Sequence, residues 1–243
     1  MVFRQAPVEL PGLAPMPGQP FGVYLHVPFC LTRCGYCDFN TYTPAQLGGV
    51  SPDRWLLALR AELELAAAKL DAPTVHTVYV GGGTPSLLGG ERLATLLDMV
   101  RDHFVLAPDA EVSTEANPES TWPEFFATIR AAGYTRVSLG MQSVAPRVLA
   151  TLDRVHSPGR AAAAATEAIA EGFTHVNLDL IYGTPGESDD DLGWSMLGCR
   201  RPGLPGTRCP IGVDRAASAG TTWVIGTVAS GGAQVRARTA TLA

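Results

Sequence analysis

The chain has 243 residues, of which 46% are hydrophobic and 7% are aromatic, a composition that can bury the core of one large domain. No stretch reaches the roughly 18 unbroken apolar residues that a membrane-spanning helix needs, so we expect no transmembrane segment. The formal net charge of −5 argues against nucleic acid as the main partner.

The first twenty residues contain five prolines, and no basic segment followed by an apolar run. We interpret residues 1–20 as an irregular lead-in rather than a secretory signal peptide. This interpretation predicts a cytoplasmic location, where reducing conditions keep thiols free.

From residue 21 onward, short apolar runs alternate with amphipathic stretches, and Gly or Pro residues mark many of their ends. The stretch 52–70 illustrates the helical pattern, because Trp55, Leu59 and Leu63 recur at helical spacing and Ser51 provides an N-cap. We expect strands at 21–27, 75–80, 111–115, 136–141 and 175–181, and helices at 52–70, 91–104, 122–132 and 158–171, with a further helix starting at 189–196.

Regular alternation of strands and helices predicts an α/β fold with parallel strands and right-handed crossovers. Polar residues follow or end several expected strands, among them Glu115, Gln142 and Asp179. A parallel barrel of the TIM type places its catalytic residues at the carboxyl ends of its strands. Asp179 also lies in an otherwise apolar strand, where an unpaired charge is costly, and this cost favours a functional role.

Three cysteines follow the first expected strand in a C-x3-C-x2-C pattern: Cys30, Cys34 and Cys37. Three thiolates from one loop can ligate three irons of a cubane iron–sulfur cluster and leave the fourth iron open. A closed zinc site usually has four ligands, and disulfide frameworks suit small secreted chains. The spacing therefore favours an open iron–sulfur site and leaves zinc or reactive thiols as alternatives.

The segment 23–30, Val-Tyr-Leu-His-Val-Pro-Phe-Cys, together with Cys34, Tyr36 and Cys37, resembles the radical S-adenosylmethionine (radical SAM) enzymes. Within them, the chain is similar to the group that contains anaerobic coproporphyrinogen III oxidase and the HemW-type heme chaperone. The likeness covers about residues 21–192. Further motifs in the family's order are Gly-Gly-Gly-Thr-Pro at 81–85, Glu-Ala-Asn-Pro at 115–118, Ser-Leu-Gly-Met-Gln-Ser at 138–143 and Asn-Leu-Asp-Leu-Ile-Tyr-Gly-Thr-Pro-Gly at 177–186.

This resemblance implies a partial (β/α)6 barrel over residues 21–196 that holds a 4Fe–4S cluster and S-adenosylmethionine (SAM) and receives electrons from a donor. It implies that Cys30, Cys34 and Cys37 ligate the cluster. The other residues that it implies as contacts of SAM or of a second ligand are Tyr24, Tyr36, Gly82, Gly83, Thr84, Glu115, Gln142, Arg154 and Asp179.

Some of these residues also have purely structural interpretations. The glycine run can simply end a strand in a turn, and Tyr24 can be a half-buried strand aromatic. Arg154 can be a solvated arginine at a helix end. His26, in the same strand as Tyr24, we interpret as a satisfied core histidine rather than a ligand.

The two branches of the group differ after the third cysteine. The oxidase has a further cysteine there, whereas this chain continues Asp38-Phe39-Asn40 and so resembles the heme-chaperone branch. The resemblance implies binding of heme or porphyrin and transfer of heme to an acceptor protein. An oxygen-independent coproporphyrinogen III oxidase, which decarboxylates its substrate oxidatively, is the alternative, so whether the chain is an enzyme stays open.

The composition changes near residue 197. Residues 1–192 have a net charge of −10, whereas residues 193–243 have a net charge of +5 with Asp214 as their one acidic residue. The likeness stops here, so we expect a barrel that is incomplete after the fifth strand and lacks the chaperone's C-terminal His-Asn-x-x-Tyr-Trp motif. We expect 197–243 to be a non-family tail, disordered or read out of frame, and a non-functional fragment is the third hypothesis. A divergent basic linker is the alternative interpretation of the tail.

Overall fold

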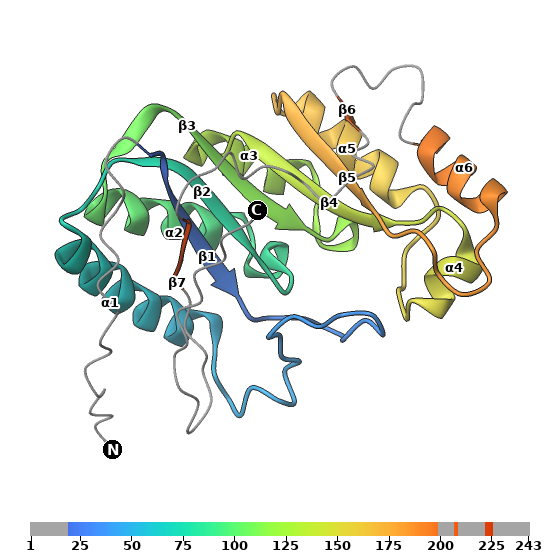
Figure 1. The fold of residues 1–243 in the computed structure, drawn as a ribbon, viewed down its shortest axis with the longest axis horizontal. Coiled ribbons are helices and arrows are strands. Elements are labelled where there is room, and N and C mark those ends of the chain that lie inside the picture. Colours follow the sequence, from blue (N-terminus) through green and yellow to red (C-terminus); the bar gives the residue numbers. More distant parts are fainter. Residues whose placement is uncertain (1–18, 199–206, 209–221, 226–243) are drawn as a thin grey trace.

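A computed structural model describes residues 19–198, 207–208 and 222–225 of the chain. Its strands form one parallel sheet in the order β6-β5-β4-β3-β2-β1-β7 (Figure 1). Five long strands make up the body of the sheet, and two short strands lie at its edges. The strands are β1 (Phe21–Val27), β2 (Val75–Gly82), β3 (Leu106–Ala116), β4 (Arg136–Gln142), β5 (His175–Leu180), β6 (Thr207–Arg208) and β7 (Thr222–Ile225).

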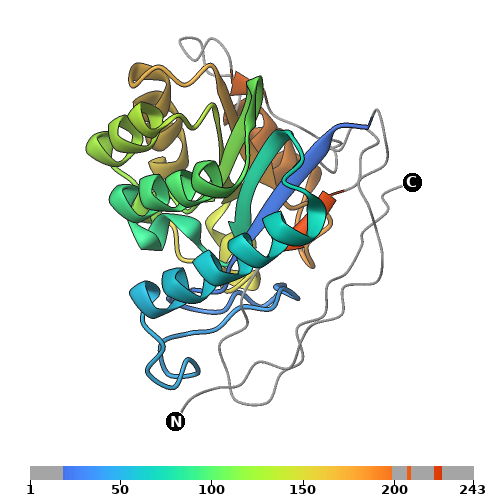
Figure 2. The same cartoon turned by 90° about the vertical axis from the view of Figure 1, so that its left-hand side faces the viewer.

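Helices α1, α2, α3 and α5 cover one face of the sheet, as the side view shows (Figure 2). This open, one-sided arrangement confirms the predicted α/β partial barrel. None of the described helices is long and apolar enough to cross a membrane. The helices are α1 (Pro52–Leu70), α2 (Gly90–His103), α3 (Pro123–Ala132), α4 (Pro146–Thr151), α5 (Arg160–Ala170) and α6 (Asp189–Gly198), with short 3-10 helices η1 (Pro85–Leu88) and η2 (Pro118–Ser120).

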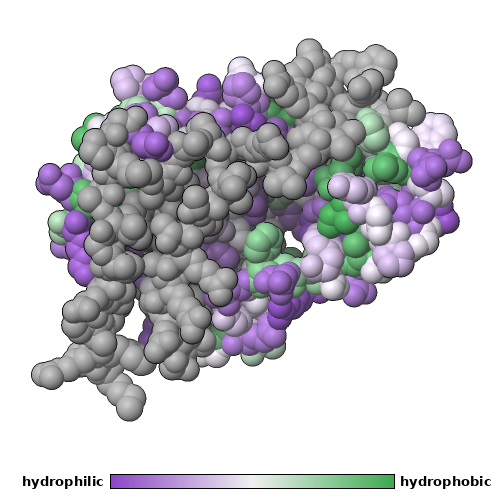
Figure 3. Space-filling view, in the orientation of Figure 1, coloured by the Kyte–Doolittle hydropathy of each residue, from purple (hydrophilic) through white to green (hydrophobic). Residues whose placement is uncertain are grey.

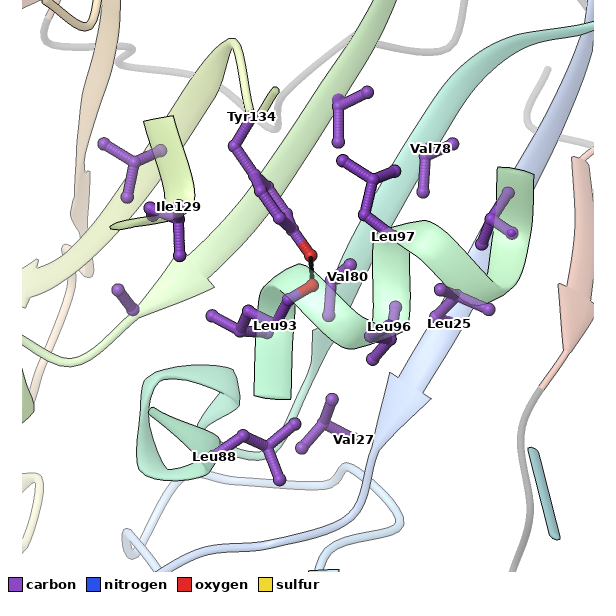
Figure 4. Close-up of a cluster of buried hydrophobic side chains, with 14 of the residues drawn as sticks. Leu25, Val27, Val78, Val80, Leu88, Leu93, Leu96, Leu97, Ile129 and Tyr134 are labelled. Atoms are coloured by element: carbon purple, nitrogen blue, oxygen red, sulfur yellow. Dashed lines mark hydrogen bonds between the residues drawn. The ribbon is translucent and has the colours of Figure 1, made fainter. Parts of the chain in front are cut away.

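Side chains alternate along the long strands between an apolar face and a polar face. In β1, Val23, Leu25 and Val27 are at most 1% exposed and face the helices, while Tyr24 points to the opposite side and is partly exposed. The close-up of the core shows Leu25 and Val27 packed with α2 side chains (Figure 4). The polar side chains of the strands are therefore left on the face that the helices do not cover.

Tyr134, between α3 and β4, donates a hydrogen bond of 2.9 Å from its hydroxyl to the carbonyl oxygen of Leu93 inside this core (Figure 4). Tyr134→Phe should lower the free energy of unfolding by about 1–2 kcal/mol, because the carbonyl loses a buried donor. Urea unfolding followed by circular dichroism measures the change. Tyr182→Phe, at a side chain that is 70% exposed, should stay within about 0.5 kcal/mol of the wild type, and equal losses would contradict the prediction.

Most predicted elements are confirmed, with shifted ends. The helix over 52–70 is α1, and Ser51 caps it by accepting a hydrogen bond from the backbone N–H of Arg54. The third strand begins at Leu106 rather than at 111, and the sequence analysis missed α4. The prediction of a tail at 197–243 lies largely outside the described residues. The described parts of that segment include β6, which pairs with β5, and β7, which pairs with β1.

Candidate cofactor-binding site

The three cysteines lie on a loop, residues 28–42, that leaves the carboxyl end of β1 and returns to it. We call this segment the cysteine loop. At its base the N–H of Tyr42 donates to the carbonyl of Pro28 (2.8 Å), and the N–H of Cys30 donates to the carbonyl of Tyr42 (3.1 Å). A parallel bridge between Phe29 and Tyr42 accompanies these bonds. The cysteine loop is thus closed at its base, while most of its residues from 31 to 40 are exposed.

The thiols of Cys30, Cys34 and Cys37 are free and partly exposed. The N–H of Cys37 donates to the carbonyl of Cys34 (3.1 Å), and the N–H of Gly35 donates to the carbonyl of Leu152 after α4 (3.2 Å). No group of three or more His, Cys, Asp or Glu side chains in the described part of the chain is arranged around a single metal ion. A cubane cluster binds each thiolate at a different iron, and three cysteines on one loop can supply those thiolates.

A cavity of about 370 Å³ opens between the cysteine loop and the carboxyl ends of the strands. The space-filling view shows the molecule hollowed near its centre (Figure 3). The cavity brings together every predicted site residue except Tyr24: the lining includes Cys30, Cys34, Tyr36, Cys37, Gly82, Gly83, Thr84, Glu115, Gln142, Arg154 and Asp179.

A larger residue would be unfavourable at each of the three glycines that end β2, for a different structural reason at each position. A Cβ on Gly81 would lie 2.5 Å from Cε1 of Tyr79 and 3.2 Å from the carboxyl carbon of Glu115. Gly82 has φ +116°, which favours glycine, and its N–H donates to Glu115. A Cβ on Gly83 would lie 2.5 Å from the carbonyl oxygen of Phe29, on the cysteine loop. The three glycines therefore let β2, β3 and the cysteine loop meet at one edge of the cavity.

Thr84 continues this edge and touches the first cysteine. Its backbone N–H donates to the carbonyl of Phe29 (2.7 Å), and its hydroxyl lies 3.8 Å from the sulfur of Cys30. Burial raises the pKa of the Cys30 thiol, and the hydroxyl of Thr84 opposes that rise. Thr84 is thus placed to support a thiolate at Cys30.

Glu115 near the end of β3 accepts two strong hydrogen bonds. Its Oε1 accepts from the hydroxyl of Tyr79 at 2.6 Å, and its Oε2 accepts from the N–H of Gly82 at 3.0 Å. Burial raises the pKa of the Glu115 carboxyl, the two donors lower it, and the nearby Asp179 raises it again. A carboxylate has about four lone-pair sites, so Glu115 can still accept from a ligand in the cavity.

Gln142 and Asp179 end the neighbouring strands β4 and β5. Gln142 has φ +68°, an uncommon conformation for a side chain other than glycine, and its side chain is buried beside the cavity. Asp179 accepts a 2.7 Å hydrogen bond from the hydroxyl of Ser138. The Asp179 carboxylate is therefore hydrogen-bonded from the neighbouring strand rather than unpaired. This contact offsets the cost of placing a charge in an otherwise apolar strand.

Arg154, after α4, is held by three hydrogen bonds. Its guanidinium donates to the carbonyl of Gly140 (3.0 Å), to Nε2 of His156 (3.1 Å) and to the sulfur of Cys34 (3.5 Å). The interpretation of Arg154 as a solvated helix-end residue is therefore wrong. A positive charge that these bonds hold in place therefore faces the cavity, where it favours an anionic ligand.

Tyr24 does not line the cavity but belongs to a hydrogen-bonded chain beneath it. Nε2 of His26 lies 2.8 Å from the carbonyl oxygen of Asn40, so Nε2 carries the proton. In the neutral ring Nδ1 then accepts from the hydroxyl of Tyr24, 3.0 Å away. His26 thus ties β1 to the cysteine loop and is satisfied, as predicted, but it lies partly exposed on the polar face of β1 and is not a core residue.

Sequence reasoning missed Gly81, Tyr79 and Ser138 as parts of the site. Gly81 and Ser138 stand inside quoted motifs. Tyr79 pairs with Tyr24 in the register of β1 and β2, and the two rings stack with centroids 5.8 Å apart. The period of two in β2, which places Tyr79 on the polar face, could have indicated it.

Comparison with known families identifies the family to which the chain belongs. Residues 24–196 match the family described as the Radical SAM superfamily. This chain belongs to the radical SAM superfamily. Among solved structures, the radical SAM chain is similar to coproporphyrinogen III oxidase from Escherichia coli, with a TM-score of 0.67 and 30% identity over 74% of this chain and 41% of that chain.

Curated relatives of this radical SAM protein include heme chaperones. It is 37% identical to heme chaperone HemW of Escherichia coli (strain K12), over 79% of this chain and 54% of the relative. It is 36% identical to heme chaperone HemW of Bacillus subtilis, over 71% and 45%. The oxygen-independent coproporphyrinogen III oxidase of Escherichia coli is 30% identical, over 77% and 40%. The chain thus spans about half the length of these relatives, and the predicted resemblance to this group is confirmed.

Proposed function

We propose that this chain binds a 4Fe–4S cluster through Cys30, Cys34 and Cys37, together with SAM, and acts as a heme chaperone in heme or porphyrin metabolism. One observation carries the proposal: three free thiols of one loop face a cavity that also gathers the polar ends of β2, β3, β4 and β5. When bound, the cluster and SAM supply one-electron radical chemistry.

The residues of the chain have distinct roles in this proposal. Gly82 and Gly83 line the cavity and let β2 pack closely against β1 and the cysteine loop, and Thr84 supports the Cys30 thiolate. Glu115, Gln142 and Asp179 offer acceptors for the ribose hydroxyls or the amine of SAM. Tyr36, on the cysteine loop, packs against the bound ligand, and Tyr24 supports the loop from beneath.

The donor set fits this pair of groups. A cubane cluster needs a thiolate at each of three irons, and the three cysteines of the cysteine loop can provide them. SAM carries an amine and a carboxylate, and the cavity contains both the Arg154 cation and the Glu115 and Asp179 carboxylates. Groups of opposite charge in one cavity can orient such a ligand.

Heme transfer is favoured over porphyrin oxidation by the sequence after Cys37. Asp38, Phe39 and Asn40 stand where the oxidase resemblance requires a further cysteine. Identity to the heme chaperones of Escherichia coli (37%) and Bacillus subtilis (36%) also exceeds the 30% identity to the oxidase of Escherichia coli. We extend the proposal to heme as the cargo, a heme-accepting protein and an electron donor as partners, and the cytoplasm as the location.

Anaerobic reconstitution tests the proposal. The wild-type chain supplied with iron, sulfide and reductant should bind about four irons and four sulfides, as one cubane requires, and should then bind SAM. A heme titration and an assay for coproporphyrinogen decarboxylation separate the two functions. Heme binding without turnover supports the chaperone, turnover supports the oxidase, and a preparation that holds only zinc contradicts both.

Glu115→Gln should weaken the binding of SAM by about tenfold or more, because the amide keeps the shape of the side chain but loses the charge that strengthens its hydrogen bonds. Calorimetry on the anaerobically reconstituted chain measures the affinity, and iron analysis should show an intact cluster. Glu124→Gln, on the exposed start of α3, is the matched control and should bind SAM like the wild type. Equal affinities for Glu115→Gln and the wild type would remove Glu115 from the site.

A further inference from the structure

Tyr79 lies outside the family motifs and has no role in the proposed function, yet it contacts Glu115 at the site. It lies on β2 between Val78 and Val80, which are fully buried against the helices, so its own side chain points to the opposite, polar face. Its hydroxyl donates to Oε1 of Glu115 on β3 at 2.6 Å. This distance is typical of a charge-assisted hydrogen bond from a hydroxyl to a carboxylate.

The neighbours of Tyr79 hold it in one place. Its ring stacks on Tyr24 from β1, with an interplanar angle of 21°. The position of a Cβ on Gly81 is only 2.5 Å from Cε1 of Tyr79, so a larger residue would push the ring away. On the other side of the carboxylate, the N–H of Gly82 occupies Oε2. Glu115 is therefore gripped from two directions, by one side chain and one backbone group.

We propose that Tyr79 is a positioning residue for SAM, because its hydroxyl fixes the Glu115 carboxylate in the orientation that faces the cavity. This inference rests on the proposed function, in which Glu115 accepts hydrogen bonds from SAM. The backbone donor of Gly82 alone fixes one oxygen and leaves the carboxylate able to rotate about the last side-chain bond. The second donor, from Tyr79, removes that freedom, so the Glu115 side chain loses less conformational entropy when SAM binds.

The hydroxyl also affects the charge of Glu115. The titratable groups that face this carboxyl are Tyr79 from β2, Tyr24 from β1 and Asp179 from β5. Burial raises the pKa of Glu115, and donation from Tyr79 opposes the rise. Loss of that hydroxyl should raise the pKa further. During acidification, the Glu115 carboxylate should then become protonated at a higher pH than in the wild type. The acceptor for SAM should be lost with it.

Tyr79→Phe tests the proposal, since it removes only the hydroxyl. Titration of the anaerobically reconstituted chain with SAM over a pH series should show about tenfold weaker binding and an acid midpoint at higher pH than in the wild type. Tyr134→Phe is the matched control, because it also removes a buried tyrosine hydroxyl that donates a hydrogen bond, but one inside the core. It should keep both the affinity and the midpoint.

Two further measurements separate this inference from the proposed function. Carbon NMR of the chain without iron follows the side-chain carboxyl of Glu115, assigned by its loss in Glu115→Gln, and its midpoint should rise in Tyr79→Phe. In the Glu115→Gln background, Tyr79→Phe should add little further loss of affinity. An unchanged carboxyl midpoint with unchanged affinity would overturn the role of Tyr79. Failure of the wild type to bind a cluster or SAM would instead overturn the proposed function, and the NMR titration would still decide whether Tyr79 controls Glu115.

Discussion

Cys34→Ala should abolish assembly of the cluster. An open cubane site has three protein thiolates and no spare ligand, so removal of one leaves two irons without a protein sulfur. The sulfur of Cys34 also receives the guanidinium of Arg154, and no other cysteine among the described residues can take its place. After anaerobic reconstitution, the iron and sulfide content and the brown absorbance should fall to background, while the circular dichroism spectrum should stay like that of the wild type.

The remaining two cysteines of the chain provide the control. Cys199 and Cys209 lie outside the described residues, and the proposal assigns them no ligand role. A chain with both Cys199→Ala and Cys209→Ala should therefore bind as much iron and sulfide as the wild type. Loss of the cluster in this double variant would show a fourth cysteine ligand and would contradict an open site.

Gly82→Ala should destabilise the fold by more than about 3 kcal/mol, because two costs add at one position. The backbone has φ +116°, which an alanine rarely adopts. The added Cβ would also lie 2.6 Å from the ring of His26 and 2.9 Å from the carbonyl oxygen of Val27. The carbonyl belongs to β1 and cannot move without breaking its strand. Urea unfolding followed by circular dichroism gives the loss of stability.

Gly159→Ala measures the cost of the positive-φ backbone conformation without the steric clash. Gly159 has φ +77°, and nothing lies within 4 Å of the position of its Cβ. The substitution should cost only about 1–2 kcal/mol from the left-handed conformation. If Gly82→Ala lost no more stability than Gly159→Ala, the close packing of β2 against β1 at this point would be contradicted.

The sequence predicted best those features that depend on local periodicity and on chain order. Helix α1 has its predicted bounds because Ser51, Pro52 and the leucine spacing all lie within the segment itself. Glu115, Gln142 and Asp179 were predicted to meet because parallel strands end at one edge of the sheet, and they do line one cavity. The cysteines were predicted from their spacing, and the other cavity residues were implied by the family resemblance.

The features that the sequence left open depend on contacts between distant segments. Arg154 has the same sequence pattern whether its guanidinium reaches solvent or Cys34, and only the packing of the segment after α4 against the cysteine loop decides between these. The partner of Asp179 is Ser138 on the next strand, which no spacing along β5 could indicate. Helix α4 was missed because its six residues are too few for a periodic pattern.

The base of the cysteine loop has a consequence for how the protein matures. Two backbone hydrogen bonds close it, from the N–H of Tyr42 to Pro28 and from the N–H of Cys30 to Tyr42, and the described hydrophobic core contains none of the three cysteines. Small zinc domains, by contrast, fold only when their metal binds. We therefore expect this scaffold to fold before iron and sulfide arrive, so that the proposed cluster, once lost to oxygen, can be rebuilt on a folded polypeptide.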